Sequence, residues 1–112
     1  MAKHEDALIV IELSRWFDEM GLPEALKEVM ADNFDVGDGS VESDAVRKVL
    51  RFGETIGSLV KHRVLDWDLI SDLYWFEGWW KRVEKFALYE RQETGEPRIY
   101  EHFEAIATRP IA

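Results

Sequence analysis

The most regular hydrophobic pattern in the chain runs through residues 69–91, LISDLYWFEGWWKRVEKFALYER. On a helical wheel at 100° per residue, its apolar side chains fall within a sector of roughly 160°. These side chains are Leu69, Leu73, Trp75, Phe76, Trp79, Trp80, Val83, Phe86 and Ala87. A strand is excluded, because alternation would place Trp79 and Trp80 on opposite faces. In the helix, Gly78 falls on the charged side. The pattern predicts one long Trp-rich helix over residues 67–92, with other helices packed around it.

Similar apolar spacings predict four further helices, over residues 5–20, 23–33, 41–62 and 97–108. Gly21 is expected to end the first helix, and Pro23 suits the first turn of the second. Ser40 or Ser43 is the expected cap of the third helix, and Asp66 caps the central one. The fold class predicted for residues 1–112 is therefore all-α, a single-domain bundle of about five helices with a long central Trp-rich helix.

Two features, one in the connection before the predicted helix at residues 41–62 and one within that helix, leave alternatives open. Residues 32–40, DNFDVGDGS, form the clearest loop, but no register supplies the oxygen ligands of a calcium-binding loop. A solvated turn is expected there, with a loose metal site at Asp32, Asp35 and Asp38 as the alternative. Gly53 and Gly57 would let another backbone approach closely, either within the chain or in a dimer.

Composition and charge narrow the classes of function. The chain has 46% hydrophobic residues and no cysteine, which excludes disulfides, thiolate zinc sites and cysteine nucleophiles. Its net charge is −9, with three Lys/Arg against ten Asp/Glu in residues 1–39. This excess of negative charge argues against nucleic acid and anionic membranes as partners. The acidic surface either serves only to keep the protein soluble or, as the alternative, binds a basic protein partner. With neither a signal peptide nor a membrane-spanning run, the chain is expected to be cytoplasmic.

Catalytic motifs are not recognisable in the sequence. His4, His62 and His102 are isolated, and neither HExxH, a P-loop, GxGxxG nor GxSxG is present. Pairing of His102 with its neighbouring glutamates at a metal is a minor alternative to an exposed histidine. We therefore expect no enzyme activity and no cofactor. A catalytic site would need Glu77, Glu84 or Glu104 in an apolar pocket.

From about Val46 onward the chain resembles a known family. The carrying segments are IGSLVKHRVLD (56–66), WDLISDLY (67–74), a Trp eleven residues before an Arg, and TGEPRIYEHFEAIA (94–107). They are similar to segments of a family of small all-helical domains of unknown function found in bacteria, archaea and phages. Residues 1–40 carry no part of this resemblance. The resemblance implies a helical fold and no known activity. Some members carry a membrane anchor ahead of the domain, and none is recognisable here.

Trp80 and Arg91 mark a second candidate feature. Trp80 lies on the apolar face, and Arg91 falls at the same wheel angle as Leu73, so its guanidinium needs a partner. Glu104 or Glu101 on the last helix is the expected one, which would make Trp80, Arg91 and Glu104 a structural clamp. The alternative is that Arg91 binds an anion.

The chain has five Trp, three Tyr and six Phe, which is more aromatic side chains than the core of so small a domain can easily bury. Trp67, Tyr74 and Tyr89 fall outside the main apolar sector, so packing by another helix or a subunit contact must cover them. The candidate interface or ligand residues are Trp67, Tyr74, Trp75, Trp79 and Tyr89. The sequence thus favours a protein–protein interaction or self-associating module that contacts a protein partner or a second copy. The alternative is a bundle that binds a small molecule or anion through Arg91 and the Trp cluster.

Overall fold

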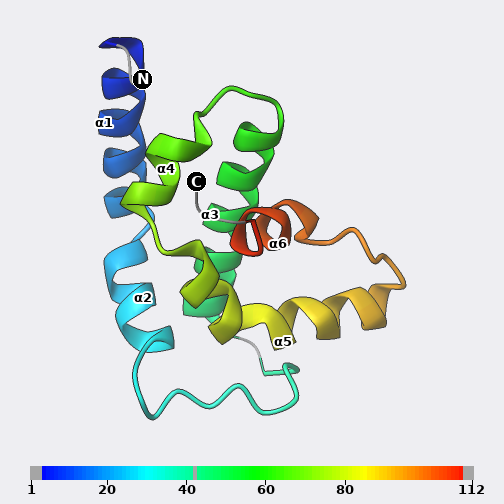
Figure 1. Cartoon of the computed structure of the whole chain (residues 1–112). Helices are drawn as coiled ribbons and strands as arrows, with labels where there is room; N and C mark the ends of the chain where they lie inside the picture. Colours follow the sequence, from blue (N-terminus) through cyan, green and yellow to red (C-terminus); the bar gives the residue numbers. More distant parts are fainter. Residues whose placement is uncertain (1–3, 42, 110–112) are drawn as a thin grey trace.

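The computed structural model describes residues 4–41 and 43–109 (Figure 1). The described residues form six α-helices and measure 43 × 28 × 22 Å. The helices are α1 (His4–Glu19), α2 (Leu22–Val29), α3 (Asp44–Lys61), α4 (Trp67–Leu73), α5 (Phe76–Thr94) and α6 (Glu101–Ala107). The all-α prediction is confirmed, and the difference of one helix comes from the Trp-rich segment.

Local signals in the sequence set several helix ends as expected. Gly21 adopts a left-handed conformation, with φ of 78°, between α1 and α2. The Ser43 hydroxyl accepts a hydrogen bond from the Val46 N–H at 3.3 Å, and so caps α3. The Asp66 carboxylate likewise accepts one from the Asp68 N–H at 3.2 Å at the start of α4. Ser43, rather than Ser40, is therefore the cap of the third helix.

The predicted continuous helix over residues 67–92 is wrong, because the chain breaks between α4 and α5. Tyr74 is extended, with φ of −133° and ψ of 137°, and Trp75 precedes α5 with ψ of 69°. The break turns α4 about its own axis, so that Trp67 and Ile70 are buried while Leu73 is exposed. It also places the Tyr74 ring among core aromatic rings. A single wheel through both helices could not predict this arrangement.

Gly78 also differs from its predicted place on a solvated face. It is buried beneath the indole of Trp75, and a Cβ atom at this position would overlap the indole ring. The absence of a side chain at position 78 therefore leaves room for the Trp75 indole in its observed orientation.

The helix at the middle of the bundle is α3, which packs against α2, α5 and α6 (Figure 1). Cβ atoms added at Gly53 and Gly57 would overlap the Phe103 ring and the main chain of His102, respectively. Both glycines therefore serve close packing of α6 on α3 within the chain, which was the first of the two alternatives. The Trp-rich segment lies beside this axis rather than forming it.

Aromatic rings fill the core on both sides of α3. Phe52 contacts the rings of four residues from α1, the α4–α5 connection and α5, namely Trp16, Phe17, Tyr74 and Trp79. Phe103 of α6 meets Trp80 edge-on, with ring centroids 5.1 Å apart. Trp79 and Trp80 are only 7% and 4% exposed. Much of the aromatic surplus in the sequence is therefore core.

Candidate functional site

The five aromatic residues predicted as interface or ligand contacts do not form one surface. Trp67 and Trp79 are buried, whereas Tyr74 and Tyr89 are half-buried. Trp75 alone among these five is largely exposed, at 61%. Tyr89 lies on α5 and lines a pocket. None of the other four aromatic residues lines that pocket.

Trp80, Arg91 and Glu104 do come together. Arg91 Nη2 lies 2.9 Å from Glu104 Oε1, although without the alignment of a hydrogen bond. Arg91 Nε donates a hydrogen bond to the Ile99 carbonyl at 2.7 Å, and the guanidinium lies 5.9 Å from the centre of the Trp80 ring. These contacts tie the end of α5 to the turn before α6 and to α6 itself. Glu101, the other proposed partner, is instead paired with Arg98 at 3.3 Å.

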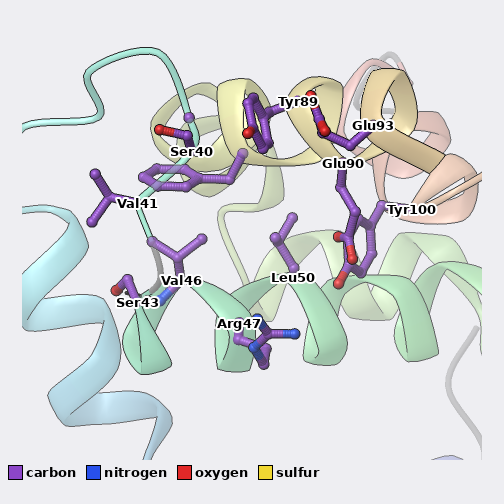
Figure 2. Close-up of a pocket in the computed structure, with 12 residues that line it drawn as sticks. Ser40, Val41, Ser43, Val46, Arg47, Leu50, Tyr89, Glu90, Glu93 and Tyr100 are labelled. Carbon is purple, nitrogen blue, oxygen red and sulfur yellow. Dashed lines mark hydrogen bonds between the residues drawn. The ribbon is translucent and has the colours of Figure 1, made fainter.

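A pocket of about 140 Å³ lies between α3, α5 and the loop that precedes α3 (Figure 2). Its apolar lining comes from Val46, Leu50 and Phe86. Figure 2 shows Val46 and Leu50 rising from α3 toward α5, which carries Tyr89, Glu90 and Glu93. Tyr100, from the turn before α6, closes one end beside Glu90, and Arg47 completes the lining from α3. The pocket therefore joins an apolar floor to a charged rim.

Tyr100, which forms one wall of this pocket, has an unusual backbone conformation. Its φ of 59° is left-handed, a region that residues with a side chain seldom adopt. Burial and the nearby negative charge of Glu90 raise the pKa of the Tyr100 hydroxyl, while the positive charge of Arg47 opposes them. The phenol is therefore protonated at neutral pH and can donate a hydrogen bond toward Glu90.

A second, more open hollow of about 490 Å³ adjoins the pocket. The two share Val41, Ser43 and Phe86 as lining residues. Together they make one depression that runs from α2 to the C-terminal half of α5, which we call the acidic groove. Its described charged lining is Glu24, Glu28, Asp35, Asp44, Glu90 and Glu93, with Arg47 and Lys48 as the bases.

The charge in this groove is only partly balanced by the groove's own bases. Lys48 Nζ lies 3.3 Å from the Asp44 carboxylate, and Arg47 has a partner as well. Carboxylates outnumber bases six to two among the described lining residues. The groove is therefore suited to a cationic rather than an anionic occupant.

The loop at residues 32–40 is an ordinary turn. Asp35 and Asp38 accept hydrogen bonds from the backbone N–H groups of Gly37 and Ser40, both at 2.9 Å. Hydrogen bonds from the Ser40 hydroxyl and, to a smaller extent, from its backbone N–H hold the pKa of Asp38 below its usual value. Within residues 4–41 and 43–109, no group of three or more His, Cys, Asp or Glu side chains is arranged to hold a metal ion.

No helix in the described ranges is both long and apolar enough to cross a bilayer. The fold is thus a small helical domain with an acidic groove on its surface. The chain belongs to the family described as a domain of unknown function, DUF4760, whose model matches residues 2–109. No curated protein and no solved structure matches the chain. The match covers α1 and α2 as well as the later helices, and it agrees with the expectation of a helical domain without a known activity.

Sequence reasoning missed the groove itself. Its lining combines α2, the loop before α3, α3 and α5, and no periodicity shows which of these will adjoin. The acidic excess of residues 1–39 was the available signal, because Glu24, Glu28 and Asp35 belong to it.

Proposed function

We propose that this protein is an interaction module that binds a basic segment of another protein in the acidic groove. The observation that carries the proposal is the excess of carboxylates around two adjoining hollows with a shared apolar floor. Opposite charge steers a basic partner to the site, and burial of apolar side chains on Phe86 and Val46 adds affinity. A net charge of −9 strengthens the same attraction over the whole chain.

The proposed role is binding rather than catalysis. Ser40 and Ser43 line the groove, but no histidine is among its described lining residues. The Ser43 hydroxyl also already accepts a hydrogen bond from the Val46 N–H. A nucleophile needs an adjacent base to act at neutral pH. A nucleic-acid partner is disfavoured because phosphates would meet the same carboxylates.

The alternative of an anion site at Arg91 has less support. Its guanidinium is already engaged by the Ile99 carbonyl, Glu104 and the Trp80 ring. Trp79 and Trp80 are buried, so they offer no open face to a ligand. Any anion would have to displace Glu104 first.

Charge reversal in the groove tests the proposal. For a fluorescein-labelled peptide rich in lysine with interspersed leucines, Glu24→Lys with Asp35→Lys is expected to weaken binding about tenfold, which corresponds to about 1.4 kcal/mol. The matched control is Glu12→Lys with Glu77→Lys, which makes the same charge change on α1 and on the exposed side of α5. Fluorescence anisotropy measures both. Equal weakening by the two pairs, or no binding by the unmodified protein, would refute the groove as the site.

Self-association is a second candidate, and an observation on α1 favours it. Residues 7–11 are five consecutive apolar residues, none of them buried, with Leu8 and Ile11 exposed at 52% and 56%. A stretch of helix that is apolar on all sides is normally covered, and a second copy offers an equally apolar surface.

Light scattering tests this second candidate. At high protein concentration the mass is expected to approach that of a dimer, and Leu8→Glu with Ile11→Glu should return it to that of a monomer. Val64→Glu is the control, because Val64 is equally exposed but lies after α3. A monomer at every concentration would remove self-association and leave the groove proposal intact.

A further inference from the structure

We infer that the pocket between α3, α5 and Tyr100 receives one lysine side chain of the bound segment. This inference rests on the proposed function and specifies the residue that anchors the partner. It depends on three features of the pocket, namely its size, the apolar character of its floor and the carboxylates at its rim.

The pocket volume matches a small aliphatic group. Its volume of about 140 Å³ is close to that of an engineered protein cavity of about 150 Å³ that admits benzene. The four-carbon stem of a lysine is a group of this size. Val46, Leu50 and Phe86 would cover the methylenes, so burial of the stem is favourable.

The rim supplies the negative charge that an ammonium group requires. Glu90 and Glu93 lie three residues apart on α5, so both face the same side of the helix. Neither carboxylate forms an ion pair with another residue in the part of the chain that the structure describes. Tyr89 and Tyr100 add aromatic rings, which attract a cation through their faces.

Tyr100 orders this end of the pocket. Its left-handed backbone turns the chain sharply before α6 and sets its ring beside Glu90, as Figure 2 shows. The protonated hydroxyl can hold one Glu90 oxygen, which leaves the other for the ammonium. Strain of this kind is found where a local structure is held for binding.

Lysine fits better than arginine. Arg47 already contributes a guanidinium to the lining, and a second planar guanidinium needs a two-pronged carboxylate contact. Glu90 is shared with Tyr100, so its two oxygens are not both open to such a contact. A compact ammonium requires only one oxygen from each glutamate.

The test uses Nα-acetyl-lysine methylamide as a probe, with backbone amide shifts of the ¹⁵N-labelled protein as the readout. Shifts are expected at residues 39–50, 86–93 and 100. The norleucine analogue, which keeps an aliphatic stem without the charge, should bind at least about tenfold more weakly. The arginine analogue should also bind more weakly than lysine.

Glu90→Gln with Glu93→Gln provides the protein-side test. These variants keep the shape of both side chains, so they should fold and lose about tenfold in affinity for the lysine probe. Glu84→Gln is the control on the same helix and is expected to bind as the unmodified protein does. Equal binding of lysine and norleucine probes, or an unchanged affinity in the double variant, would overturn the inference.

The outcome also separates this inference from the proposed function. If the lysine-rich peptide binds the groove but the lysine probe gives no shifts in the pocket, the anchor is wrong and the groove proposal stands. If neither binds, both fail.

Discussion

Replacing Gly57 with alanine is expected to lower the free energy of unfolding by about 2 kcal/mol. The added Cβ would overlap the main chain of His102 at the start of α6, and a main chain in a packed helix cannot move aside cheaply. Overpacking of this kind costs about 1–3 kcal/mol, or occasionally more, and an overlap with main chain places the cost at the upper end of this range. The gain of about 1 kcal/mol in helix propensity then leaves a net loss of about 2 kcal/mol. Urea denaturation followed by circular dichroism measures the difference.

Gly78→Ala is the matched control on α5. The atoms nearest to its Cβ belong to the indole of Trp75, a side chain exposed enough to rotate away. The helix-propensity gain should then offset most of the cost, and stability should change by less than about 1 kcal/mol. If the two variants are equally stable, α6 does not pack on α3 as closely as described.

Replacing Arg91 with alanine is expected to have a similarly large effect, with a loss of about 1–3 kcal/mol. It leaves the Ile99 carbonyl without its donor and removes the contacts to Trp80 and Glu104. The lost hydrogen bond dominates, since the Glu104 carboxylate is partly exposed and its ion pair is screened by water.

Arg98→Ala provides the comparison for this prediction. Arg98 pairs with Glu101 at 3.3 Å on the exposed surface, so its removal should leave the denaturation midpoint nearly unchanged. Equal effects of the two arginine variants would mean that Arg91 makes no clamp between α5 and α6.

Local signals accounted for what the sequence predicted correctly. Gly21, Ser43 and Asp66 act on their own neighbouring residues, so their effects are visible without knowledge of the fold. The pairing of Arg91 with Glu104 could also be foreseen, because an arginine on an apolar helix face next to a short connection has few partners to choose from.

Long-range contacts account for what the sequence did not predict. Glu54 of α3 accepts hydrogen bonds from the His102 and Phe103 N–H groups at 2.9 and 3.0 Å, and so caps α6 from another helix. Arg82 donates to the Met30 carbonyl at 3.1 Å, just past the end of α2. Such partners lie about fifty residues apart, beyond the reach of any helical periodicity.

The break at Tyr74 and Trp75 has the same origin. The apolar spacing over residues 69–91 suits a single helix, yet the chain forms two shorter helices in which Trp67, Ile70 and Phe76 are all buried. Tertiary packing overrides the local pattern here.

The most direct measurement of the groove proposal is a map of backbone amide shifts when a lysine-rich peptide is added to the ¹⁵N-labelled protein. The shifts are expected at residues 24–28, 35–48 and 86–93, and should fade as salt is added, because screening weakens attraction between exposed charges. Shifts confined to α1 and α4, or no shifts at low salt, would contradict the acidic groove as the binding surface of this domain.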